Sequence, residues 1–162
     1  MQAMSQSSSK KGKRSAQAAV LPPKESGISE EAAFLLARAR NMAFAEAAQG
    51  RIGNGLCLLQ DALETEPMAH DLLSDMAALL LSAGELTHAE AYARKALDIS
   101  PEHGASLYTL AFSQSGQQSP EKARETLRHL LQGDALRSLM QEAPDLLPVA
   151  MTELSRLDGL LG

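Results

Sequence analysis

The chain has 162 residues and a formal net charge of −5, a length that suits one domain or one domain with tails. Apolar residues make up 44% of it and aromatic residues only 3%, and Ala and Leu dominate over the β-branched residues that strands prefer, so the composition predicts an all-α fold. The single Cys57 excludes an internal disulfide and a multi-cysteine metal site, and no apolar run approaches the roughly 18 residues of a membrane span.

Residues 1–28 are predicted to form a disordered basic leader. They carry five basic residues and one acidic residue, whereas the rest of the chain carries 10 basic and 19 acidic residues. A serine run, a lysine run and Pro22-Pro23 leave too little apolar surface to offset the entropy of ordering. No apolar segment follows the basic residues, as it would in a secretory signal. We therefore expect a cytoplasmic protein.

The charge distribution also bears on the partners. An acidic body does not attract nucleic acid or an anionic membrane, so we expect neither as a partner. The basic leader could contact either one, but a few charges on a disordered tail are more typical of a solubilising segment.

Ordered structure is predicted to begin at Ser29, whose hydroxyl can cap a helix with Glu30 and Glu31 in its first turn. From there to about residue 132 the pattern predicts helices of about 12–15 residues, the first one longer. The predicted breaks are Gln49-Gly50, Thr65-Glu66-Pro67, Ala83-Gly84, Ser100-Pro101, Gln117-Gln118-Ser119-Pro120 and Gln132-Gly133.

Two helix starts carry specific signals. Thr87-His88-Ala89-Glu90 is interpreted as a capping box, in which the hydroxyl and the carboxylate each bind a free backbone amide. Ser119-Pro120 combines a capping hydroxyl with proline at the first helical position.

A repeat of 34 residues is the most informative pattern. Pro67 and Pro101 are 34 residues apart, and each follows an Ala-Leu pair near the end of a helix. Small residues fall into fixed columns, which two antiparallel helices need where they pack closely. The columns are Ala43, Ala77 and Ala111; Gly55, Ala89 and Ala123; and, for a larger residue, Leu63, Leu97 and Leu131.

The sequence resembles a tetratricopeptide repeat (TPR) protein over roughly residues 36–137, with repeats at about 36–69, 70–103 and 104–137. Gly84 falls on the turn between the two helices of a repeat, but Gln118 stands at that place in the third repeat, and Gly55 stands where the family has Ala. The resemblance implies a right-handed superhelical solenoid of three helical hairpins. The alternative is an ordinary helical bundle with a coincidental spacing.

The domain boundaries follow from this reading. We expect a TPR domain over residues 29–135 and capping helices over 136–162. Near this end, residues 135–143 and 145–161 are predicted to be two helices separated by Pro144. An apolar stripe on the second helix should pack on the third repeat, because the last repeat of a solenoid needs a cover. The alternative is that a partner covers this stripe.

No catalytic, cofactor or metal site is predicted. His70, His88, His103 and His129 show no metal-ligand spacing and are interpreted as exposed or capping residues. Cys57 is flanked by leucines and is interpreted as a small core residue. We therefore expect a protein without enzymatic activity.

The resemblance implies that the first helix of each repeat lines a concave groove. The residues implied to line it are Arg40, Phe44, Ala47, Asp71, Ser74, Ala78, Leu81, Ala105, Tyr108, Phe112 and Ser115. They describe a mostly apolar groove with aromatic anchors, suited to a protein or peptide segment with apolar side chains. The alternative is that the aromatic residues fill the superhelix, covered by the chain's own tail. One Arg facing Asp71 does not make the carboxylate clamp of TPR co-chaperones.

The expected function is protein binding, as an adaptor, scaffold or small chaperone. The layout of leader, three repeats and cap looks like that of the small cytosolic chaperones of bacterial type III secretion, which hold hydrophobic translocator subunits. A self-assembling TPR structural protein is a further alternative, and a homodimer is left open.

Overall fold

The computed structural model describes residues 29–162, and the predicted leader, residues 1–28, lies outside them. The described residues form eight α-helices and one 3-10 turn and no strand, so the predicted all-α fold is confirmed. The elements are α2 (Glu30–Ala48), α3 (Ile52–Thr65), α4 (His70–Ser82), α5 (Leu86–Ile99), α6 (Gly104–Gly116), α7 (Pro120–Leu130), α8 (Gly133–Glu142), η1 (Pro144–Leu146) and α9 (Leu147–Leu161). None of these helices combines the length and apolar character that crossing a membrane requires.

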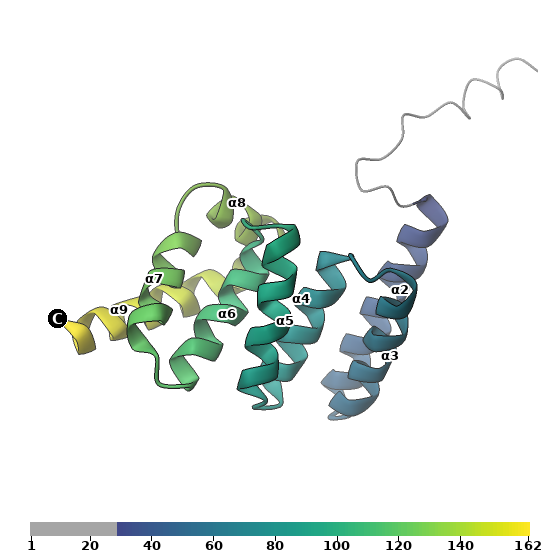
Figure 1. Cartoon of the computed structure of the whole chain (residues 1–162), viewed down its shortest axis with the longest axis horizontal. Helices are drawn as coiled ribbons and strands as arrows, with labels where there is room; N and C mark the ends of the chain where they lie inside the picture. The colour runs from purple at the N-terminus through teal and green to yellow at the C-terminus, as the bar shows by residue number, and fades with distance from the viewer. Residues whose placement is uncertain (1–28) are drawn as a thin grey trace, which may run out of the picture. The chain divides into compact units, whose positions relative to one another are not determined.

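From Leu35 onward, the chain is a row of antiparallel helical hairpins, α2–α3, α4–α5 and α6–α7 (Figure 1). They are followed by α8, η1 and α9, which we call the C-terminal segment. Each predicted break falls at or between helix ends. The turn inside each hairpin contains a residue with left-handed backbone, Gly50 with φ 84°, Gly84 with φ 81° and Gln118 with φ 62°. These three positions are 34 residues apart, so the third repeat keeps the turn geometry without the glycine that favours it.

The columns of small residues lie where the helices approach one another. Ala43, Ala77 and Ala111 have no exposed surface, and neither have Ala89 and Ala123. A Cβ atom added to Gly55 would lie 2.6 Å from the backbone oxygen of Ala43 on α2. Glycine is therefore required at this place, where it departs from the family pattern, because the two helix backbones approach more closely than an alanine side chain permits.

The C-terminal segment packs on the third hairpin. Ala135 and Leu139 of α8 and Ala150 and Leu157 of α9 are fully buried in one cluster with residues of α6 and α7. The break at Pro144 is present as the 3-10 turn η1 between α8 and α9. Not all of the predicted stripe is covered, because Met151 remains exposed.

The helix starts are only partly as predicted. Ser29 does cap α2, since its Oγ accepts a hydrogen bond from the amide of Ala32 at 3.1 Å. The capping box is wrong: α5 begins at Leu86, after Glu85, with no side-chain cap. Both side chains instead bind Gln117 of the next hairpin. The Thr87 hydroxyl donates to Gln117 Oε1 at 3.3 Å, and Gln117 Nε2 donates to Glu90 Oε1 at 2.8 Å. Ser119 precedes α7 and Pro120 begins it as predicted, but Ser119 makes no capping hydrogen bond.

Cys57 is exposed, so its interpretation as a core residue is wrong. The buried side chains of α3 are Leu59 and Leu63, together with Gly55. Cys57 is two positions before Leu59, which turns it about 200° away around the helix.

The close approach at Gly55 generates a test of the first hairpin. Gly55→Ala should lower the free energy of unfolding by about 1–3 kcal/mol, because the added methyl group meets the Ala43 carbonyl. Gly53→Ala on the same helix has nothing within 4 Å of the new Cβ, and should leave that free energy unchanged or raise it by up to about 1 kcal/mol. Denaturant unfolding of both variants measures the difference. Equal effects would contradict the α2–α3 contact.

A second glycine tests the docking of the C-terminal segment. A Cβ atom on Gly104 of α6 would lie 2.5 Å from the backbone nitrogen of Leu139 on α8. Gly104→Ala should therefore displace α8 and lower the free energy of unfolding by about 1–3 kcal/mol or more. Hydrogen exchange should show faster exchange in α8 than in α4. Gly159→Ala, in open space on α9, is the matched control, and slow exchange of α8 in the Gly104 variant would show that the contact is absent.

Candidate functional site

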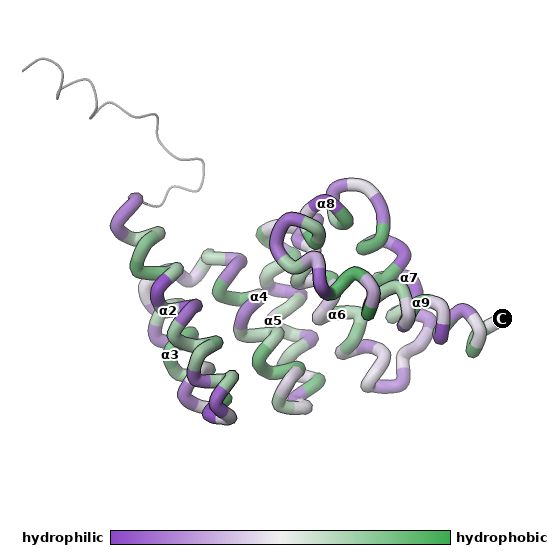
Figure 2. The backbone as a smooth tube through the Cα atoms, turned by 180° about the vertical axis from the view of Figure 1, so that it is seen from behind, coloured by the Kyte–Doolittle hydropathy of each residue, from purple (hydrophilic) through white to green (hydrophobic). Residues whose placement is uncertain are grey.

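The predicted groove residues all lie on α2, α4 and α6, the first helix of each hairpin. Figure 2 shows these helices in the row of hairpins, coloured by the hydropathy of each residue. The predicted groove residues divide into an apolar set and a polar set. The apolar set is Phe44, Ala47, Ala78, Leu81, Ala105, Tyr108 and Phe112. The polar set is Arg40, Asp71, Ser74 and Ser115.

Phe44 is the most accessible member of the apolar set, with 41% of its surface exposed. Ala47 beside it, and Ala78 and Leu81 on α4, are half-buried. An exposed aromatic ring can bury an apolar side chain of a ligand.

Tyr108 and Phe112 lie deeper than Phe44. Their ring centroids are 4.5 Å apart with the planes tilted by 31°, and both rings pack against the cluster formed with the C-terminal segment. Burial, together with the charge of Glu153, raises the pKa of Tyr108. These two aromatics therefore contribute to holding the C-terminal segment.

The α6 end of this face is shared with α9. The Ser115 hydroxyl donates to Glu153 Oε1 at 2.5 Å, and Arg156 in turn contacts both residues. A cavity of about 330 Å³ remains beside Phe112, and α9 supplies the rest of its lining, including Pro148 and Val149. The segment that we expected to cap the third repeat thus also supplies most of the lining of this cavity.

Arg40 is fully engaged by carboxylates of α4. Its Nε and Nη2 donate to the two oxygens of Asp75 at 2.5 and 3.3 Å, and its Nη1 lies 3.8 Å from Asp71. Asp75 is only 7% exposed, and this burial raises the pKa of its carboxyl although Arg40 opposes the shift. The sequence analysis did not identify Asp75 as a partner of Arg40, one of the predicted groove residues. Ser74 beside it is buried as well.

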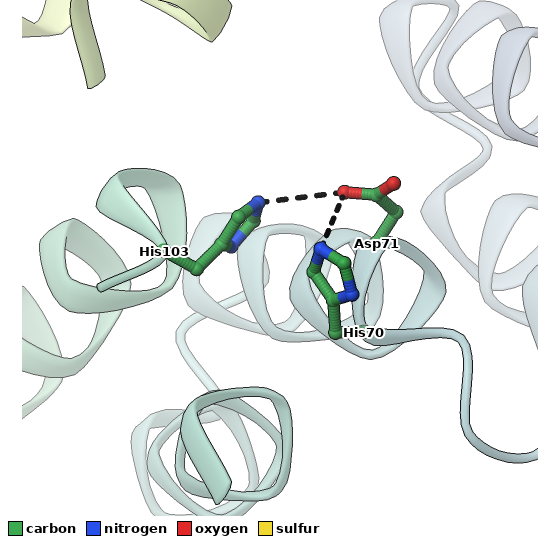
Figure 3. A group of neighbouring side chains, drawn as sticks. All are labelled: His70, Asp71 and His103. Atoms are coloured by element: carbon green, nitrogen blue, oxygen red, sulfur yellow. Dashed lines mark ion pairs between the residues drawn. The ribbon is translucent and has the colours of Figure 1, made fainter. Parts of the chain in front are cut away.

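A cluster of His70, Asp71 and His103 lies beside this ion pair (Figure 3). Asp71 Oδ1 is 3.5 Å from His70 Nε2 and 3.4 Å from His103 Nε2, and the two imidazole rings meet edge to face at 4.9 Å. Glu142 at the end of α8 reaches the same imidazole, with its Oε2 3.0 Å from His103 Nε2. Burial lowers the pKa of His103, but Asp71 and Glu142 outweigh it and raise the pKa overall. The contact with His103 is the main reason why the pKa of Asp71 is lowered.

His103 is only 5% exposed, although it stands at the capping position before α6. The prediction that each histidine is exposed or capping therefore did not anticipate the burial of His103. No local spacing joins His70 to His103, because they meet only when α4 and α6 stack. The available signal was that both stand at the start of the first helix of consecutive repeats.

Comparison with known proteins supports the repeat assignment. Residues 80–143 match the family model described as tetratricopeptide repeat. These residues run from the end of α4 past the end of α8. Among curated proteins, none matches the sequence.

Solved structures of similar fold include the TPR2B-domain:pHsp70 complex of yeast Sti1, with a TM-score of 0.65, 16% identity, and coverage of 78% of this chain and 98% of that chain. The first TPR of Spaghetti (RPAP3) bound to the HSP90 peptide SRMEEVD has a TM-score of 0.66 and 14% identity, and covers 83% and 96% of the two chains. The first TPR domain of human RPAP3 has a TM-score of 0.59 and 12% identity, with 77% and 96% covered. The fold is thus that of a TPR solenoid with a C-terminal helix, and together with the family match over residues 80–143 it supports a tetratricopeptide repeat protein.

Proposed function

We propose that this chain is a protein-binding TPR module, an adaptor or small chaperone, and that it holds an apolar segment of a partner protein in the groove lined by α2, α4 and α6. Two of the solved structures of similar fold are complexes of TPR domains with Hsp70 or HSP90 peptides, which supports peptide binding as the general role. The proposed partner segment differs from those peptides in its chemistry.

The observation that carries the proposal is that Phe44 on α2 is 41% exposed, at a position that the resemblance places in the groove. Ala78 and Leu81 on the adjacent first helix, which the resemblance places on the same surface, are half-buried. Aromatic side chains that become desolvated in a groove contribute a large share of binding energy. The cavity beside Phe112 and Val149 gives a second place for an apolar side chain. An extended or helical segment with spaced apolar residues fits such a surface.

The charges of the groove argue against an acidic tail as the ligand. Arg40 is the basic residue among the predicted groove positions, and its guanidinium already binds Asp75 and lies near Asp71. A partner carboxylate at this place would have to displace a buried ion pair and would face the charge of Asp71. Binding should therefore depend on apolar contacts and only weakly on salt.

A narrower form of this proposal is a cytosolic chaperone for the hydrophobic translocator subunits of type III secretion, which rests on the layout of repeats and cap. Such a chaperone should be stabilised by one unfolded apolar partner, whereas an adaptor should be stable alone and bind folded surfaces. The identity of the captured partner separates the two roles.

The test places a photo-crosslinking benzoylphenylalanine at position 44 in the native host and identifies the segment that it captures. Phe44→Ala should then weaken the affinity for that segment by about thirtyfold, which is about 2 kcal/mol. Phe44 is 41% exposed and belongs to none of the core clusters of the described residues, so the melting temperature should change little.

Met42→Ala is the matched control, because Met42 is similarly exposed on the same helix but lies about 200° around it. Unchanged affinity in the Phe44 variant, or an equal loss in the Met42 variant, would place the binding surface elsewhere. Binding abolished by salt would contradict an apolar site.

A further inference from the structure

We infer that His70, Asp71 and His103, with Glu142 beside them, form a binding site for a divalent transition-metal cation of the zinc class. The proposal concerns the polar end of the face formed by α4 and α6, and it does not depend on the proposed peptide groove. It also replaces the expectation from the sequence that the chain has no metal site.

The first argument is the spacing of the donor atoms. One nitrogen or oxygen from each of His70, Asp71 and His103 can be chosen so that all three lie within 4.8 Å of one another. Zinc binds nitrogen and oxygen ligands at roughly 2.0–2.2 Å in a tetrahedron, which separates neighbouring ligand atoms by about 3.4 Å. The contacts of Asp71 Oδ1 with the two imidazoles, at 3.4 and 3.5 Å, already have this length. His70 is half-exposed, so its ring can turn toward the ion.

The second argument is that the two central donors form no hydrogen bond, although they lie 3.4 Å from each other and His103 Nε2 lies 3.0 Å from Glu142 Oε2. His103 Nε2 and Asp71 Oδ1 are both buried, and neither has a hydrogen bond to any of the described residues. His103 as a residue is 95% buried, with 5% of its surface exposed, and its Nε2 points at Asp71 (Figure 3). Buried polar atoms nearly always form hydrogen bonds in folded proteins, so an imidazole nitrogen and a carboxylate oxygen that face each other with ion-pair contacts but no hydrogen bond indicate a shared ligand.

The third argument is the support around the ligands. His103 Nδ1 is 2.7 Å from the hydroxyl of Ser106, which has no exposed surface. A hydrogen bond at the second ring nitrogen fixes the orientation of a metal-binding histidine and leaves Nε2 for the metal. This is the arrangement of His103.

Charge favours a divalent ion at this place. Asp71, Asp75 and Glu142 contribute three negative charges and Arg40 one positive charge, which leaves two negative charges uncompensated. Arg40 approaches Oδ2 of Asp71, so Oδ1 remains for the cation. Two imidazoles in the donor set favour zinc-class ions over Mg²⁺ or Ca²⁺, which prefer oxygen ligands alone.

The site would join three parts of the fold. Its donors come from the start of α4, the residue before α6 and the end of α8. A cation bound there would fasten the second and third hairpins to the C-terminal segment, and binding only to the folded state would stabilise all three together.

The experiment uses the full chain carrying Cys57→Ser, so that the exposed thiol does not bind metal. Zinc titration calorimetry should give one ion per chain, and Co²⁺ should give the strong visible absorption of tetrahedral coordination. His70→Gln and Glu142→Gln should weaken zinc binding at least tenfold and at least twofold, respectively. Zinc should also raise the melting temperature of the chain that carries only Cys57→Ser, and slow its hydrogen exchange in α8.

His129→Gln is the matched control, because His129 also pairs with a carboxylate, Glu102 at 3.0 Å, but is exposed and outside the cluster. It should leave zinc affinity unchanged. Circular dichroism of each variant confirms that it is folded, and His70 and Glu142 offer two independent surface positions should one of them disturb folding. Absence of stoichiometric zinc binding, or equal affinity of the His70 variant and the His129 control, would overturn the proposal.

Discussion

The rest of this structure depends on one constraint: antiparallel helices approach one another closely at positions that hold only alanine or glycine. Ala43, Ala77 and Ala111 have no exposed surface, and each lies on the first helix of its hairpin. At Gly55 the approach is closer still, because the carbonyl of Ala43 occupies the space of a Cβ atom. A helix pair this close fixes its neighbours, since every larger side chain around it must fit the remaining space.

Regular stacking then decides which distant residues meet. Positions about 34 residues apart become neighbours on adjacent first helices, so the starts of α4 and α6 bring two imidazoles together. The same stacking places Arg40 of α2 on Asp75 of α4. The first helices thus carry a polar cluster where these groups gather and apolar residues at other positions, such as Phe44 and Leu81.

The regular part of the fold was predictable from the sequence, because it follows from local rules and a repeat. Turn residues marked the helix ends, and the alanine columns marked the buried contacts. Two of the wrong predictions share a physical cause, which is contact between hairpins. Thr87 and Glu90 satisfied every local criterion for a capping box, yet Gln117 from the next hairpin binds both. The burial of His103 likewise depends on groups of α4, α6 and α8 that no local pattern connects.

The helix that carries each predicted groove residue was predictable, but the exposure of these residues was not. The resemblance placed Phe44, Tyr108 and Phe112 on the first helices, where they are. It did not predict that Tyr108 and Phe112 would pack with the C-terminal segment while Phe44 stays exposed. That difference arises from α9, whose path after Pro144 is set by packing on α6 and α7.

The docking of α8 and α9 on the third hairpin also makes the two ends of the row of hairpins different. A further hairpin cannot stack on α6 and α7 while these helices hold the buried contacts there. Open fibres grow by head-to-tail contacts, in which one end of each copy binds the opposite end of the next. With one end occupied by its own chain, two copies that met through their hairpin ends would have to use the same α2–α3 surface on both sides. Such a contact closes on itself as a two-fold pair and adds no third copy.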